Sequence, residues 1–152
     1  MDDIRPGEIA VETPAGPDAG VWFIGRIRTP WTSRRETPRQ GALDGPVCRI
    51  EVFAPWDRGV DAASEHDHLQ VLYWLHEARR DLVRQSPKSD GRTRGVFSLR
   101  SPVRPNPIGS SIVKLERIEG STLFVRGLDC LDGTPLVDLK PERCAFSPPP
   151  RA

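Results

Sequence analysis

Residues 109–127, GSSIVKLERIEGSTLFVRG, decide the fold of this chain. Two runs rich in β-branched and apolar residues, 109–118 and 121–127, flank Glu119 and Gly120, and this pattern predicts a β-hairpin. Further short strands are expected at 22–28, 47–53, 69–75, 95–100 and 136–140. Short strands separated by Gly, Asp or Pro turns favour an all-β fold, a small β-barrel or tightly curled sheet with one or two short helices.

Residues 60–85 are ambiguous, because their propensities would also suit one long helix. Residues 69–75 are nearly continuous and apolar, however, which is typical of a strand buried on both faces. We therefore expect a short helix near 62–66, a buried strand at 69–75 and a helical turn at about 77–84. Residues 31–46 are polar and contain Pro and Gly, so they are expected to form a long connection.

The length of 152 residues corresponds to about one domain. The net charge is +1, no apolar run is as long as a membrane span, and no signal-peptide pattern is present, so a cytoplasmic protein is expected. Residues 1–20 are expected to be a flexible leader, 21–145 the barrel domain and 146–152 a proline-rich tail.

The cysteine and histidine spacings predict neither a disulfide framework nor a metal site. The cysteines are odd in number and widely spaced, so they are expected to be reduced and mostly buried: Cys48, Cys130 and Cys144. His66 and His68 form an HxH pattern, but Asp67 is the only neighbouring carboxylate and no third ligand lies at a recognisable spacing. We therefore expect no metal.

A proline-rich stretch at 100–109, RSPVRPNPIG, predicts a stiff loop, because each proline fixes its own φ and restricts the preceding residue. Its guanidinium groups suit a planar carboxylate or phosphate. Residues 91–115 carry several basic side chains and no acid, so this region is locally basic.

Two aspartates in the stretch 128–141, LDCLDGTPLVDLKP, are candidate catalytic residues. Asp132 begins a turn signature, so it serves either the turn or the chemistry. Asp129 lies beside an apolar strand, where an unpaired carboxylate is costly to bury, so it either pairs with an arginine or faces a polar cleft. No GxGxxG, GxxxxGK[ST], HExxH or GxSxG motif is present, so the common nucleotide-fold and hydrolase classes have no local support.

Taken together, these motifs resemble the TsaA-like family, whose characterised members are TrmO-type tRNA methyltransferases. The resemblance rests first on 95–115, GVFSLRSPVRPNPIGSSIVKL, and 127–141, GLDCLDGTPLVDLKP. Three upstream pieces follow the family's order: IGRIRTPW at 24–31, TPRQG at 37–41 and HLQVLYWLH at 68–76. It covers about residues 22–141. Family tRNA enzymes usually continue past a KPY motif, whereas Glu142 follows Pro141 here.

The resemblance implies a β-barrel methyltransferase outside the Rossmann class, which binds S-adenosylmethionine and works as a homodimer. Such enzymes methylate N6 of N6-threonylcarbamoyladenosine at position 37, in the anticodon loop of certain tRNAs. For that RNA, the expected nucleic-acid contacts are Arg92, Arg94, Arg104 and Asn106. Carried over by motif, the cofactor contacts would be Pro38, Arg39, Gln40, His76, Glu77, Arg100, Leu128, Asp129, Cys130 and Leu131. Two alternatives remain open: a module that binds S-adenosylmethionine without catalysis, and a methyltransferase for a different substrate.

Overall fold

The structure, a computed structural model, describes residues 3–89 and 91–152. The elements are, in chain order, β1 Ile9–Ala10, β2 Gly25–Arg28, β3 Cys48–Val52, η1 Asp57–Val60, η2 Ala63–Glu65, β4 His68–Trp74, β5 Leu82–Gln85, β6 Arg94–Gly95, η3 Val96–Ser98, β7 Ile108–Glu119, β8 Thr122–Arg126 and β9 Pro135–Pro141, where η marks a 3-10 helix. The chain divides into two compact units. The smaller contains Met1–Val21 and Leu75–Gly109, and the larger, the barrel unit, contains Trp22–Trp74 and Ser110–Ala152.

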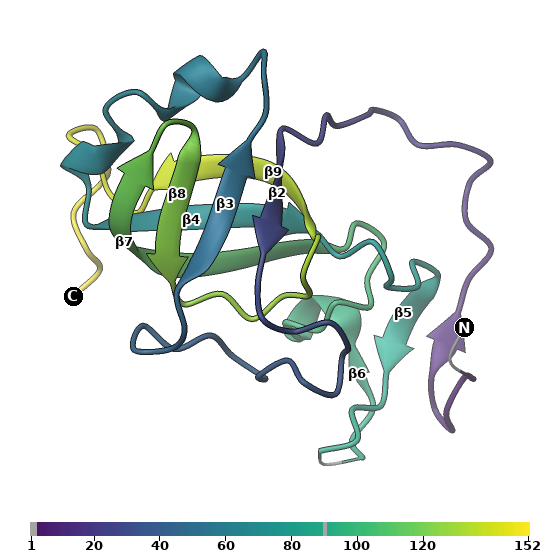
Figure 1. Ribbon diagram of the computed structural model, residues 1–152. Helices are drawn as coiled ribbons and strands as arrows, with labels where there is room; N and C mark the ends of the chain where they lie inside the picture. Colours follow the sequence, from purple (N-terminus) through teal and green to yellow (C-terminus); the bar gives the residue numbers. More distant parts are fainter. Residues whose placement is uncertain (1–2, 90) are drawn as a thin grey trace. The chain divides into compact units, whose positions relative to one another are not determined.

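Within the described residues, six strands close into a barrel in the order β2-β3-β8-β7-β4-β9, and β9 pairs back onto β2 (Figure 1). The expected all-β fold with a small barrel is therefore confirmed. Alternate side chains of each strand face the interior, as the two-residue period of a strand requires. The centre of the barrel is filled by fully buried side chains, namely Ile27, Ile50, Val71, Val113, Leu123, Val125 and Leu136. Burying each of them stabilises the fold by about 1.5–3 kcal/mol.

The hairpin that decides the fold is formed by β7 and β8. Glu119 pairs with Thr122 across a tight turn, and Gly120 there has a φ of +62°, a conformation that side chains with a Cβ disfavour. A register shift lies between Leu115 and Arg117. The strands expected at 109–118, 121–127 and 136–140 are confirmed as β7, β8 and β9.

Strand β4 confirms the strand expected at 69–75, but not its burial on both faces. Leu69, Val71 and Tyr73 are buried, whereas the alternate residues, such as Leu72 and Trp74, are half-buried. A barrel has one interior face, so only every second residue of β4 enters the core. The short helix expected near 62–66 is present as η2.

Two local expectations are wrong. The helical turn expected at 77–84 is replaced by a hydrogen-bonded turn over Leu75–Ala78 and the strand β5. The strand expected at 95–100 is mostly the 3-10 helix η3. Long-range pairing decides the first outcome, because β5 lies between β1 and β6 in a three-stranded sheet. In the second, the local bond from the Leu99 amide to the Val96 carbonyl at 3.2 Å closes the 3-10 turn.

Part of the segment expected to be a flexible leader, residues 1–20, contacts the chain around β5. Its first two residues lie outside the described residues. β1 pairs antiparallel with β5. Arg5 donates to the Ser86 carbonyl at 2.7 Å, and Glu8 Oε1 accepts from the Ser86 amide at 3.0 Å. These bonds lie within the smaller unit and attach Arg5, Glu8 and β1 to the chain around β5.

Candidate ligand site

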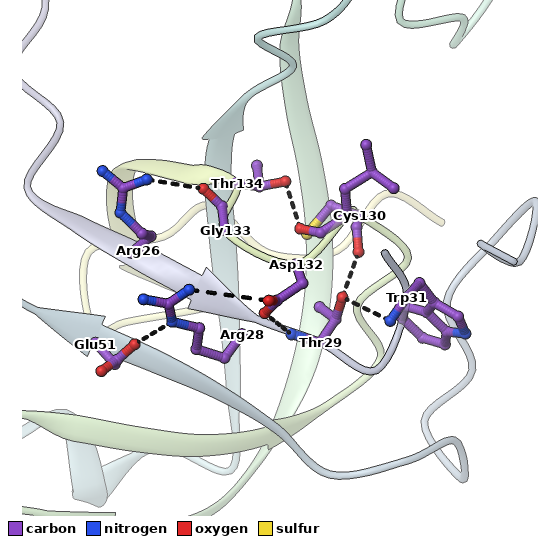
Figure 2. Close-up of polar contacts among 10 residues, drawn as sticks. Arg26, Arg28, Thr29, Trp31, Glu51, Cys130, Asp132, Gly133 and Thr134 are labelled. Carbon is purple, nitrogen blue, oxygen red and sulfur yellow. Dashed lines mark hydrogen bonds and ion pairs between the residues drawn. The ribbon is translucent and has the colours of Figure 1, made fainter. Parts of the chain in front are cut away.

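The loop between β8 and β9 carries both candidate catalytic aspartates and is held by the chain that follows β2 (Figure 2). The Thr29 hydroxyl donates to the Cys130 carbonyl at 2.8 Å. The Asp132 amide donates to the Trp31 carbonyl at 2.7 Å. Since these bonds join segments about 100 residues apart, the loop has a defined backbone conformation before any ligand binds.

Asp132 serves the turn that the sequence predicts. The Thr134 amide donates to the Leu131 carbonyl at 3.2 Å, and Gly133 between them has a φ of +82°. Asp132 Oδ1 accepts from the Thr29 amide at 3.1 Å, and its other oxygen lies 3.9 Å from an Arg28 nitrogen (Figure 2). The Asp132 carboxylate therefore connects the turn to the end of β2.

Asp129 lies in a different environment, next to a buried tyrosine. The Tyr73 hydroxyl donates to Asp129 Oδ1 at 2.9 Å and lies 2.9 Å from the Ser111 hydroxyl. Tyr73 is only 4% exposed, and burial, followed by the nearby Asp129 charge, raises the pKa of Tyr73 well above its usual value. The phenol therefore stays protonated and keeps donating to the half-buried Asp129. Among the described residues, the partner of Asp129 is therefore this phenol and no arginine pairs with it.

The loop over residues 31–46 packs tightly on the start of this site. A Cβ on Gly41 would lie 1.8 Å from the Gly127 carbonyl oxygen and 3.1 Å from the Leu128 carbonyl carbon, so the two backbones approach as only glycine allows. Glu36 orders the loop by accepting from the Thr32 and Ser33 amides, both at 2.9 Å.

This packing brings two of the expected cofactor-binding segments together in the barrel unit. They are Pro38, Arg39 and Gln40, directly before Gly41, and Leu128, Asp129, Cys130 and Leu131, directly after Gly127. The Arg39 and Gln40 side chains are exposed, whereas Leu128 and Cys130 are buried. Burial raises the pKa of the Cys130 thiol to about 12, so Cys130 is a neutral side chain of the core.

The other expected cofactor contacts lie in the smaller unit. His76 and Glu77 are exposed at the centre of the Leu75–Ala78 turn, and Arg100 is exposed at the start of the proline-rich loop. The Leu75 amide donates to the Pro107 carbonyl at 2.8 Å, so the turn is attached to the end of that loop.

Arg104 is built into the proline-rich loop rather than presented from it. Its guanidinium donates to the Leu99 carbonyl at 2.9 Å and to the Ser101 carbonyl at 3.1 Å. Arg80 donates to the Pro105 carbonyl at 2.6 Å and to Asn106 Oδ1 at 3.3 Å. Arg104 is therefore bonded close to its own position in the chain, and Asn106 accepts from Arg80, which lies outside the loop.

The remaining basic candidates of the smaller unit, Arg92 and Arg94, are exposed and half-buried respectively. Among the described residues, no group of three or more His, Cys, Asp or Glu side chains is placed to hold a metal ion. In residues 3–89 and 91–152, no helix is long and apolar enough to cross a membrane.

Sequence reasoning missed Tyr73, Ser111 and Thr29, which orient the loop and Asp129. Tyr73 is the only tyrosine of the chain and occurs within an apolar strand. A buried phenol needs a hydrogen-bond partner, so a tyrosine in an apolar strand indicates a buried polar contact. The partner itself could not be inferred, because it lies 56 residues away.

The closed six-stranded barrel, with its ordered 127–134 loop, places this chain in a class of small all-β proteins with no Rossmann dinucleotide fold. Residues 26–145 match the family model of the tRNA-methyltransferase O N-terminal domain. The chain therefore belongs to the tRNA-methyltransferase O (TrmO) family.

Relatives and solved structures agree with this assignment. The chain is 54% identical over 145 residues to the probable S-adenosyl-L-methionine-binding protein VirR of Rhizobium radiobacter, with 95% of this chain and 83% of VirR covered. It is 32% identical to the mouse tRNA (adenine(37)-N6)-methyltransferase, with 83% of this chain and 31% of the mouse protein covered. The crystal structure of TrmO from Pseudomonas aeruginosa superimposes with a TM-score of 0.67 at 31% identity, over 87% of this chain and 60% of that one.

Proposed function

We propose that this chain binds S-adenosylmethionine and transfers its methyl group to N6 of N6-threonylcarbamoyladenosine at position 37 of tRNA. Membership of the TrmO family supports the reaction class. The VirR relative is named for the cofactor, and the mouse relative is named for adenine 37 of tRNA. The observation that carries the proposal is the close packing of Gly41 on Gly127, which joins two expected cofactor segments in the barrel unit.

The residues of the barrel unit fit such a cofactor. Asp129 Oδ1 accepts from Tyr73, which leaves Oδ2 to accept from an amino group or a ribose hydroxyl. The Leu128 and Cys130 side chains are buried in the core, so we propose their backbone groups, rather than the side chains, as the contacts. Exposed Arg39 is suited to the carboxylate of an amino acid.

When bound, S-adenosylmethionine supplies an electrophilic methyl group on a sulfonium. The residues of this chain hold the reactants in line, and positioning of this kind supplies most of the rate in such transfers. The lone pair of N6 in a carbamoylated adenosine is delocalised, so a group that accepts the N6 proton helps. Asp129 is the better candidate of the two carboxylates, because Thr29 and Arg28 already engage Asp132. Asp132 is then a positioning residue.

Methyl transfer is tested with labelled S-adenosylmethionine and total tRNA. Label in N6-threonylcarbamoyladenosine is expected for the wild type and is expected to fall at least tenfold for Asp129→Asn. Asp138→Asn is the matched control, because Asp138 pairs with Lys140 at 3.3 Å on the barrel surface and is outside the proposed site. Cofactor binding without transfer to tRNA would overturn the tRNA substrate.

A second candidate function is a module that binds S-adenosylmethionine without catalysis. It is favoured by the names of several relatives, among them the 42% identical probable S-adenosyl-L-methionine-binding protein of Methanothermobacter thermautotrophicus. Transfer of label to any substrate excludes it. We further propose that the protein is cytoplasmic and forms a homodimer. Light scattering tests the dimer, and a monomeric mass would contradict it.

A further inference from the structure

One row of directly opposed residues crosses the outer face of the barrel. Arg28 on β2 pairs with Arg49 on β3, Arg49 pairs with Phe124 on β8, and Phe124 pairs with Arg117 on β7. Their strand neighbours, such as Ile50 and Leu123, are buried, so the four side chains point outward. We call these four residues the arginine row.

The arginine row lines a groove of about 830 Å³ in the barrel unit. The Arg117 guanidinium carbon lies 3.7 Å from the centre of the Phe124 ring, so a cation is stacked on a half-buried aromatic face. Pro46 and Val47 add an apolar wall to the groove. The groove therefore combines a stacking surface with three arginines. Two carboxylates, Glu51 and Asp132, also line it, and Arg117 pairs with Glu119 at 2.9 Å.

Stability alone does not explain the charges of this row. Like charges on directly opposed strand residues destabilise a sheet, and Arg28 faces Arg49. Arg28 is compensated by Glu51 at 2.6 Å. Arg49 is exposed, and no partner is recorded for it among the described residues. An uncompensated arginine next to an aromatic ring points to an anionic ligand with planar groups.

We propose that the arginine row binds single-stranded RNA, with an unpaired base stacked at Phe124 and Arg117 and a phosphate at Arg49. Sheets that bind RNA use aromatic side chains for the bases, while arginines contact the backbone or stack. An acidic peptide would use the charge but not the stacking surface, so RNA fits more of the observed features. The inference rests on the proposed function for the source of the RNA, a tRNA loop. Its test needs no cofactor.

The test measures fluorescence anisotropy of a fluorescein-labelled ten-nucleotide single-stranded RNA of mixed sequence. Phe124→Ala is expected to raise Kd at least about fivefold, since loss of one stacked base has about that effect or more. Phe124→Leu, which keeps most of the apolar volume, is expected to weaken binding in the same direction and covers the case in which the alanine variant folds poorly. Arg49→Ala is expected to lower the slope of log Kd against log salt by about 0.7, the value for one phosphate contact to a single strand.

Arg58→Ala is the matched control, because Arg58 is exposed in η1 of the same unit and lies outside the groove. It is expected to change Kd less than twofold. The proposal is overturned if the RNA does not bind, if Arg49→Ala and Phe124→Leu bind it as the control does, or if a ten-residue polyglutamate binds as tightly with the same dependence on Phe124. Calorimetry of S-adenosylmethionine on the same proteins separates the two proposals. If the cofactor binds but RNA binding does not depend on the arginine row, only the RNA proposal is overturned. If RNA binding depends on the arginine row but the cofactor does not bind, only the proposed cofactor site is overturned.

Discussion

The hydrogen bond from Tyr73 to Asp129 gives the sharpest prediction about the site. Tyr73→Phe removes a buried hydroxyl that donates to a carboxylate at 2.9 Å. Buried hydrogen bonds to charged groups contribute about 1.5–3 kcal/mol, so the free energy of unfolding should fall by about that amount. For a domain of this size the midpoint of thermal unfolding should fall by about 3–12 °C. Urea denaturation measures the free energy and differential scanning calorimetry the midpoint.

A double-mutant cycle isolates the bond itself. Tyr73→Phe, Asp129→Ala and the double variant should give a coupling free energy of about 1–2 kcal/mol, because the two side chains are in contact. Tyr73→Phe with Asp57→Ala is the matched control and should be additive, since Asp57 is exposed in η1 and belongs to neither β4 nor β9. A coupling below about 0.5 kcal/mol for Tyr73 and Asp129 would refute the proposed orientation of the carboxylate, because unconnected sites add within that limit.

Three further predictions concern pH, packing and thiol chemistry. Because the pKa of Tyr73 is raised in the folded state, its hydroxyl contributes fully to stability below about pH 10, the pKa of an unfolded tyrosine, and progressively less above it. The wild type should therefore lose stability relative to Tyr73→Phe between about pH 10 and 11. Parallel curves of unfolding free energy against pH for the two proteins would contradict this. Gly41→Ala should raise the Kd for S-adenosylmethionine at least about tenfold, because a Cβ 1.8 Å from a carbonyl oxygen must displace the loop by more than the tolerance of a binding site; calorimetry measures it, with Gly59→Ala, a position with open space, as control. A thiol reagent at about pH 8 should react rapidly with exposed Cys144, whose pKa the Ser147 hydroxyl lowers, and slowly with buried Cys48 and Cys130. The wild type should show one rapid phase that Cys144→Ser lacks, and equal rates for all three thiols would contradict the buried environments.

The sequence predicted the barrel well because its signals are local. The hairpin of β7 and β8 follows from residue alternation around Gly120, and the turn at Asp132 and Gly133 from turn chemistry. Both depend on residues a few positions apart. Where strand identity depended on a distant partner, as for β5, prediction failed, because a four-residue segment has no decisive pattern of its own.

The sequence named the segments of the proposed site but not their arrangement in space. The motif resemblance selected the segments around Gln40 and Asp129. In the structure they come together where Gly41 packs on the Gly127 carbonyl. It did not indicate that Arg104 bonds to its own loop, since that depends on a backbone path set by several prolines. The arginine row could not be predicted either, because Arg28, Arg49 and Arg117 become neighbours only through strand register.

The central claim is that this chain holds S-adenosylmethionine, and calorimetric titration of the wild-type protein with that ligand measures it most directly. The account predicts saturable binding with one ligand per chain, weakened at least tenfold by Asp129→Ala and unchanged by Asp138→Ala. Absence of binding at millimolar ligand would contradict the account, and so would binding that Asp129→Ala leaves unchanged.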